Sequence, residues 1–93
     1  KNKKVVFNVN PNPFNSAIDI HFMGFEDKMV NIYVYDMLGK LIANIYSGYK
    51  NEDIINIHWN GKNLKGHQVG SGIYFLTFIA GDYISTKKIT LLE

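Results

Sequence analysis

Hydrophobic and polar residues alternate with period two along most of this chain, and turn-forming residues interrupt the alternation every eight to twelve residues. This pattern is typical of short β-strands that bury one face. We expect strands at residues 5–9, 17–23, 29–35, 40–46, 53–59, 72–80 and 83–92. Because no apolar stripe with helical spacing continues for three turns, helices should be nearly absent.

The third of these segments shows the alternation most clearly. Val30, Ile32 and Val34 should face a core, while Tyr33 and Tyr35 should face outward. The pattern therefore predicts a sheet that buries one face and carries aromatic side chains on the other. We expect these two tyrosines to pack against their neighbours in the sheet.

Two later segments depart from simple alternation. Residues 72–80 are apolar on both faces, which predicts a central strand. In residues 83–92, Ile84 and Ile89 cannot share a face of a regular strand, because they are an odd number of positions apart. We therefore expect a β-bulge at residues 85–87 that reconciles the two isoleucines.

Polar and glycine-rich stretches separate the predicted strands. Asp36 and Gly39 frame a tight turn, in which the aspartate can bond the backbone and the glycine can accept a positive φ. Residues 47–51 should form the next turn, and residues 60–72 a longer polar loop. Tyr74 follows that loop directly, so its hydroxyl should tie back to it, as in the tyrosine corner of immunoglobulin domains.

The number and spacing of the predicted strands indicate the fold class. Seven short strands in 93 residues predict an all-β fold, a seven-stranded immunoglobulin-like β-sandwich. We expect residues 1–4 to be the end of a linker and residues 5–93 to form a single domain. The chain starts at Lys1 without a methionine, so we interpret it as part of a longer protein.

Composition excludes several classes of function. The chain has no cysteine, which excludes disulfides and thiolate metal sites. Its ten basic residues are all lysines, they are scattered, and the net charge is only +2, so nucleic acid is not an expected partner. No apolar stretch approaches the roughly 20 residues of a membrane helix, so we expect no membrane insertion.

Side chains that could support catalysis do not form a recognisable constellation. His21, His58 and His67 have no ligand-like spacing, so no metal site is predicted. The glycine-rich residues 66–72 lead into a strand, whereas a phosphate-binding loop leads into a helix. The acids lie mostly at turns or on polar faces. We therefore expect no catalytic residues and no cofactor, and a function other than that of an enzyme.

Five segments of the chain, taken in order, carry a resemblance to a known family. They are Pro11-Asn12-Pro13-Phe14-Asn15, Ile32-Tyr33-Val34-Tyr35-Asp36-Met37-Leu38-Gly39-Lys40, Trp59-Asn60-Gly61-Lys62-Asn63, Gly72-Ile73-Tyr74-Phe75 and Lys87-Lys88-Ile89-Thr90-Leu91-Leu92. In this order and spacing they resemble the C-terminal sorting domain of cargo proteins of the type IX secretion system (the Por secretion system), found in the Bacteroidetes. The resemblance spans about residues 7–93.

This resemblance implies a function and a set of residues that serve it. It implies that a translocon recognises the last segment, which consists of Lys87, Lys88, Ile89, Thr90, Leu91 and Leu92. It implies a second signal-bearing segment, which consists of Pro11, Asn12, Pro13, Phe14 and Asn15. The remaining matches, for which we expect structural roles, are Asp36, Gly39, Trp59, Gly61, Gly72 and Tyr74.

The family also implies partners and a destination. The domain would be recognised by the outer-membrane translocon after transit through the periplasm, and a surface sortase would then act on the cargo at the outer-membrane surface or outside the cell. Lys87 and Lys88 should present charge to the translocon, and an edge position of the last strand would let a partner add a strand. The same edge makes either a monomer or a weak dimer plausible.

Two other functions remain open from the sequence. The first is an immunoglobulin-like spacer similar to the domain of flagellar hook-capping proteins, which share the Trp-Asp/Asn-Gly and Gly-x-Tyr pattern. The second is a carbohydrate-binding module that uses Tyr33 and Tyr35 as a stacking platform.

Overall fold

Seven β-strands make up the regular structure of this chain. The computed structural model describes residues 6–25, 27–50 and 54–92, so the predicted linker end at residues 1–4 lies outside the described residues. The strands are β1 (Val6–Asn10), β2 (Ile18–Met23), β3 (Lys28–Asp36), β4 (Leu41–Lys50), β5 (Ile54–Trp59), β6 (Gly72–Ala80) and β7 (Tyr83–Leu91). Among the described residues there is no helix, and so none that is long and apolar enough to cross a membrane.

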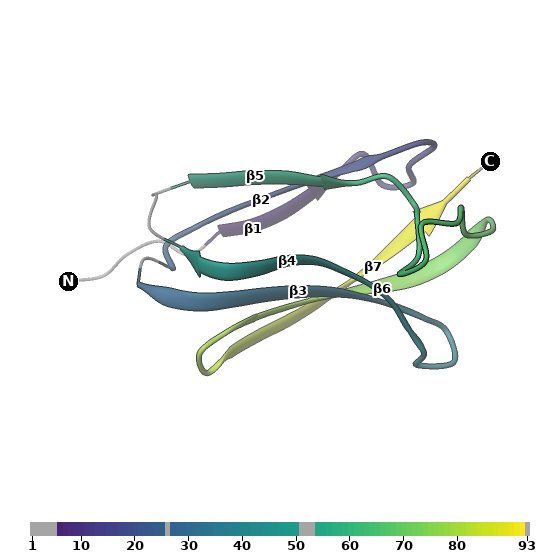
Figure 1. The fold of residues 1–93 in the computed structure, drawn as a ribbon. Helices are drawn as coiled ribbons and strands as arrows, with labels where there is room; N and C mark the ends of the chain where they lie inside the picture. Colours follow the sequence, from purple (N-terminus) through teal and green to yellow (C-terminus); the bar gives the residue numbers. More distant parts are fainter. Residues whose placement is uncertain (1–5, 26, 51–53, 93) are drawn as a thin grey trace.

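The strands form two antiparallel sheets that lie one above the other (Figure 1). One sheet has the order β1-β2-β5, and the other has the order β4-β3-β6-β7. Strand β6 therefore lies inside its sheet, as its two apolar faces predicted, and β7 lies at an edge. This arrangement confirms the predicted all-β, immunoglobulin-like sandwich.

The core fills the space between the two sheets with the inward residues of each strand. Ile20 and Phe22 of β2 are fully buried, as are Ile32 of β3 and Phe78 of β6. The rings of Phe22 and Phe78 meet edge to face, with their centroids 4.9 Å apart. Each such side chain contributes about 1.5–3 kcal/mol when it leaves water, so alternation along the strands is the main determinant of the fold.

The predicted bulge in the last strand is wrong. Strand β7 pairs with β6 in one continuous register from Ala80 and Tyr83 to Gly72 and Leu91. Ile84 faces solvent and is 65% exposed, whereas Ile89 is completely buried. The two isoleucines thus keep the opposite faces that a regular strand gives them, and no bulge is needed to reconcile them.

Strand β4 is longer and less regular than the sequence indicated. It continues to Lys50, although residues 47–51 were predicted to turn; residue 51 lies outside the described residues. The long partner strand β3 explains this, because it pairs with β4 along the whole stretch from Tyr35 to Lys28. Ser47 also donates a hydrogen bond to the Asn31 side chain on β3. The register shifts of this sheet lie between β3 and β4, at Ile32/Tyr33 and Val34/Tyr35.

The elongated sandwich has two different ends. The molecule measures 43 × 22 × 20 Å, and the strands run roughly along its length. The end on the right of Figure 1 carries the loop after β1, the β3–β4 hairpin, the loop after β5, the start of β6 and the end of β7. The opposite end carries the β6–β7 hairpin and the turn that joins β2 to β3.

Candidate recognition surface

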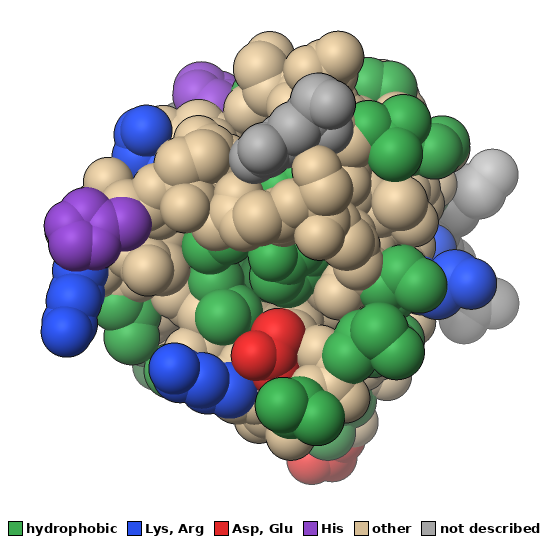
Figure 2. Space-filling view, turned by 90° about the vertical axis from the view of Figure 1, so that its right-hand side faces the viewer, with side chains coloured by type: hydrophobic (Ala, Val, Ile, Leu, Met, Phe, Trp, Pro, Cys, Tyr) green, Lys and Arg blue, Asp and Glu red, His purple; other side chains and the backbone are tan. Residues whose placement is uncertain are grey.

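All five segments that carry the family resemblance reach one end of the sandwich, although residues 32–35 of the second segment lie along β3. We call this end, formed by residues 11–15, 36–40, 59–63, 72–75 and 87–92, the motif end. These segments are far apart in the sequence, but they lie together at the right-hand end in Figure 1. Figure 2 looks onto this end and shows hydrophobic side chains in a central hollow. His and Lys side chains lie on the left, an acidic and a Lys side chain lie at the lower rim, and another Lys lies on the right.

Three aromatic residues join the segments of the motif end to one another. Phe14, Trp59 and Tyr74 are all buried. The ring centroids of Phe14 and Trp59 lie 5.8 Å apart, and those of Trp59 and Tyr74 lie 5.9 Å apart. Phe14 also forms a β-bridge with Leu91, and Tyr74 pairs with Asp36 across β6 and β3. Ring contacts therefore join three of the segments, and backbone pairing of Phe14 and Tyr74 connects the other two to them.

The polar atoms of this cluster fix the neighbouring loop. The Trp59 indole N–H donates a hydrogen bond to the Lys62 carbonyl (2.9 Å). The Tyr74 hydroxyl donates one to the Gly70 carbonyl (2.7 Å), which confirms the predicted tyrosine corner. The burial of Trp59 likewise confirms that it belongs to the core. Both aromatic residues thus tie the loop after β5 to the sandwich.

The segment Pro11–Asn15 lies against the outer edge of β7, and we call it the strap. The Asn12 side chain accepts a hydrogen bond from the Thr90 N–H (3.0 Å) and donates one to the Lys88 carbonyl (2.9 Å). Next to it, the Phe14 N–H donates to the Thr90 carbonyl, and the Leu92 N–H donates to the Phe14 carbonyl, both at 2.8 Å. The strap therefore pairs with the last part of β7 as a short extra strand would.

The strap limits the part of the β7 edge with which a partner strand could pair. All of β7 was expected to be an edge to which a partner strand could add, but the strap already pairs with residues 88–92. Backbone groups of Ile84 and Thr86 point to the same edge, because outward-facing groups recur at every second residue. Nothing in the described part of the chain pairs with them. The open edge is therefore limited to residues 84–88.

The side chains of the last segment face in two directions. Ile89 and Leu91 are completely buried in the core. Lys87 is half-buried on the same face of β7, with its ammonium 5.4 Å from the centroid of the Phe7 ring. That Lys87 presents charge to a translocon stays a prediction. Lys88 and Leu92 are exposed. A partner that meets the folded domain can thus contact Lys88 and Leu92, but not Ile89 or Leu91.

The predicted structural residues occupy turns of the motif end. The Asp36 carboxylate accepts hydrogen bonds from the N–H groups of Leu38 and Lys40, both at 2.9 Å, and Gly39 has a φ of 83°. This confirms the predicted turn. Gly61 and Gly72 also have positive φ values, 78° and 152°. Asp36 and Gly39 thus form the turn that the sequence indicated, and Gly61 and Gly72 adopt backbone conformations that favour glycine.

Two asparagines of this end have structural roles that were not predicted. Asn12 was expected in a signal-bearing segment, but its side chain also pairs with β7. Asn63 had no predicted role, and its side chain closes the turn that ends at His67. A signal was present for Asn63, because Asn63–His67 repeats the Asp-x-x-Gly-Lys spacing of residues 36–40 with Asn and His at its ends. Nothing local in the sequence indicates the partner of Asn12.

Other candidate chemistry lies away from the motif end or does not assemble. His21 and His58 lie on the outer face of the three-stranded sheet, opposite Asn56 and Asp19 respectively. No group of three or more His, Asp or Glu side chains among the described residues could hold a metal ion. The Tyr33 and Tyr35 rings are tilted by 51° with their centroids 6.2 Å apart, so they do not form one flat stacking surface.

The fold and the candidate recognition surface together define the class of this protein. The chain is an immunoglobulin-like domain whose distinctive residues gather at one end, around an edge strand and three turns. Its sequence matches the family described as secretion system C-terminal sorting domain over residues 8–91. The chain therefore belongs to that family. No curated protein sequence matches it.

Two solved structures have the same fold. Dimeric latent PorU from Porphyromonas gingivalis is similar with a TM-score of 0.75 and 20% sequence identity, over 92% of this chain and 9% of that chain. PorZ, an essential bacterial surface component of the type IX secretion system of Porphyromonas gingivalis, is similar with a TM-score of 0.66 and 17% identity, over 94% of this chain and 11% of that chain. The present chain thus spans about a tenth of either protein.

Membership of the family establishes the general function of this domain. It is a C-terminal sorting signal for cargo of type IX secretion, and domains of this family are not catalytic in general. The secretion machinery recognises such domains, and the cargo reaches the cell surface or the extracellular space.

Proposed function

We propose that the secretion machinery recognises this domain in its folded form by binding its motif end. The observation that carries this proposal is the convergence of five distant segments on one end through the cluster of Phe14, Trp59 and Tyr74. Exposed Lys88 and Leu92 and the strap are the parts of this surface that belong to the two signal-bearing segments. The buried Ile89 and Leu91 support this surface by holding β7 against the core.

The proposal includes the route and the partners. Residues 5–93 act as a single sorting domain of a larger exported protein, and that protein passes through the periplasm before the outer-membrane translocon binds the motif end. A surface sortase then acts on the cargo. Because β1 begins away from the motif end, a preceding cargo domain would leave this surface free (Figure 1). The domain is either a monomer or a weak dimer that pairs through the open edge at residues 84–88.

A reporter fusion tests this proposal. Residues 1–93 are fused to the C-terminus of a periplasmic reporter in a host that has a type IX secretion system, and the reporter at the cell surface is measured. We expect the wild-type domain to deliver the reporter. Lys88→Glu should reduce delivery several-fold, because it reverses an exposed charge of the motif end and leaves the backbone bonds to the strap intact.

The matched control reverses the charge of the other end. Lys28 is exposed at the start of β3, away from the motif end, and Lys28→Glu should leave delivery unchanged. Retention of the wild-type fusion in the periplasm would contradict the proposal, as would equal delivery by the two variants. Urea unfolding of both variants should show that each remains folded.

A further inference from the structure

The turn of the β3–β4 hairpin is stabilised by the side chain of its first residue, Asp36. Asp36 Oδ1 accepts hydrogen bonds from the N–H groups of Leu38 and Lys40. The backbone of the same turn adds bonds from Gly39 N to Asp36 O and from Asp36 N to Lys40 O, both at 3.0 Å. The turn is therefore fixed by four hydrogen bonds around a glycine in the left-handed region. Lys40 follows the glycine at its end.

The loop after β5 contains a second turn built in the same way. Asn63 Oδ1 accepts hydrogen bonds from the N–H groups of Lys65 and His67, at 2.9 and 3.0 Å. The Gly66 N–H donates to the Asn63 carbonyl (2.9 Å), and the Asn63 N–H donates to the His67 carbonyl (2.8 Å). Gly66 has a φ of 81°, close to the 83° of Gly39. The motif end thus carries two turns of one design.

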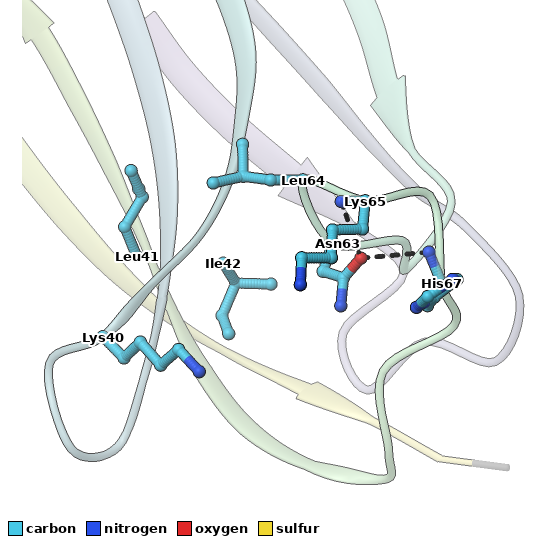
Figure 3. A pocket seen from close by; sticks show the side chains of 7 residues that line it. All are labelled: Lys40, Leu41, Ile42, Asn63, Leu64, Lys65 and His67. Carbon is cyan, nitrogen blue, oxygen red and sulfur yellow. Dashed lines mark hydrogen bonds between the residues drawn. The ribbon is translucent and has the colours of Figure 1, made fainter.

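A hollow of about 330 Å³ lies between these two turns (Figure 3). Residues 40–42 line it on the hairpin side, and Asn63, Leu64, Lys65 and His67 line it on the side of the second turn. Side chains of both turns surround the space in Figure 3, with the dashed bonds of Asn63 at its rim. Because hydrogen bonds hold the backbone of both turns, a ligand would meet a largely preformed site.

All ionisable side chains that line the hollow are basic. Lys40 and Lys65 contribute ammonium groups and His67 an imidazole, and no carboxylate lines the space. A second hollow of about 350 Å³ shares Asn63 and Leu64 with the first; Lys62 lines it, and again no acid does. Three lysines of a chain whose net charge is only +2 therefore line two adjoining hollows, which we call the groove.

The lining is also partly apolar. Leu41, Ile42 and Leu64 contribute aliphatic side chains to the hollow, and Leu64 is 65% exposed to solvent. Exposed aliphatic side chains beside cations are typical of surfaces that bind another protein. The combination fits a ligand that presents carboxylates and aliphatic groups on the same face, as an extended peptide does when acidic and aliphatic residues occupy successive second positions.

We propose that the hollow between the two turns binds an extended acidic segment of a partner protein. The carboxylates of that segment pair with Lys40 and Lys65, and its aliphatic side chains pack on Ile42 and Leu64. This inference rests on the proposed function, since it names the chemistry of a partner that reads the motif end. It adds a surface outside the last strand and the strap.

A peptide titration tests the chemistry directly. Isotope-labelled residues 1–93 are titrated with two blocked pentapeptides, and amide signals are followed by NMR. Glu-Ser-Leu-Ser-Glu (the Glu-Leu peptide) and Lys-Ser-Leu-Ser-Lys (the Lys-Leu peptide) each place their charged and aliphatic side chains on one face of an extended chain. We expect the Glu-Leu peptide to shift the signals of residues 40–42 and 63–67, and the Lys-Leu peptide to shift none of them. No shift at these residues, or equal binding of the two peptides, would overturn the proposal. Phosphatidylglycerol vesicles that shift these signals when the Glu-Leu peptide does not would also overturn it.

Charge reversal within and outside the groove sharpens the test. Lys65→Glu should weaken binding of the Glu-Leu peptide by about threefold or more, because it replaces an attraction by a repulsion at an exposed site. The backbone N–H of residue 65, which bonds Asn63, is retained in this variant. Lys28→Glu carries the same change of charge at the other end and should bind as the wild type does. Equal affinities of the two variants would contradict the assignment.

The reporter fusion separates this inference from the proposed function. Lower surface delivery by the Lys65→Glu fusion than by the Lys28→Glu fusion would support the groove as a docking site. Delivery equal to that of the wild type would overturn it and leave the proposed function intact. Failure of the wild-type fusion to reach the surface would contradict the proposed function instead, and the peptide titration would then decide the inference by itself.

Discussion

Tyr74 joins the aromatic cluster of the motif end to the loop before β6 through its hydroxyl group. Because that hydroxyl donates to the Gly70 carbonyl (2.7 Å), Tyr74→Phe removes a hydrogen bond and leaves the packing of the ring in place. We expect the free energy of unfolding to fall by about 1 kcal/mol. Urea denaturation measures this change, and Tyr49→Phe on exposed β4 should show no loss. Equal stability of Tyr74→Phe and the wild type would argue against the tyrosine corner.

Two isoleucines of β7 report on the register of the last strand. Ile89 is completely buried and Ile84 is 65% exposed, so the same substitution should have very different effects at the two positions. Ile89→Ala should lower the free energy of unfolding by about 2–5 kcal/mol, because it leaves a cavity in the core. Ile84→Ala should change it by less than about 0.5 kcal/mol. Similar losses for both variants would mean that a bulge brings Ile84 to the core after all.

At the scale of elements, the strap is the feature that distinguishes β7 from an ordinary edge strand. The Asn12 side chain bonds the Thr90 N–H and the Lys88 carbonyl as a backbone would. Asn12→Ala should therefore lower the free energy of unfolding by about 1 kcal/mol, since it removes two exposed hydrogen bonds whose backbone groups water can then bond. It should also speed hydrogen exchange at the Thr90 amide, which NMR measures residue by residue.

Asn15→Ala is the control for the strap. Asn15 is exposed and belongs to the same segment, but its side chain makes no hydrogen bond with the described residues. We expect wild-type stability and wild-type exchange at Thr90 in this variant. Unchanged exchange at Thr90 in Asn12→Ala would contradict the role of the strap as a cover for the edge.

The strands themselves were largely predictable from the sequence, because burial follows alternation. The alternation correctly predicted that Val30, Ile32 and Val34 face the core, and the two apolar faces of residues 72–80 correctly predicted a central strand. The errors arose where a partner strand overrides a local signal. β4 continues past a predicted turn because β3 pairs with it, and the bulge expected at residues 85–87 is absent because β7 keeps one continuous register with β6.

On the scale of the whole molecule, what the sequence could not indicate is the convergence of the motifs. The order of the segments suggested a family, but their meeting at one end depends on contacts such as Phe14 with Leu91 and Trp59 with Tyr74, which are distant in the chain. Local patterns carry no information on such pairings. The hollow between the turns at residues 36–40 and 63–67 was also not predictable from the sequence, because each turn by itself is a common type and gives no sign of the other.

The convergence suggests that a partner reads the folded end of the sandwich and has no need to extract β7. A disulfide across β6 and β7 can test this, because Thr77 and Thr86 lie opposite each other with their hydroxyl oxygens 3.1 Å apart. Their backbone groups point away from each other, an arrangement in which opposed side chains lie closest. The chain has no other cysteine, so Thr77→Cys with Thr86→Cys can form only this bridge within the domain.

The most direct measurement is therefore surface delivery of a reporter fused to this doubly substituted domain, with the disulfide verified as formed in the exported fraction. The two single cysteine variants serve as controls. If the folded motif end is the signal, the locked domain should reach the surface as efficiently as the single variants do. Retention of the locked fusion in the periplasm, with normal delivery of the single variants, would contradict recognition of the folded end and show that β7 must leave the sheet.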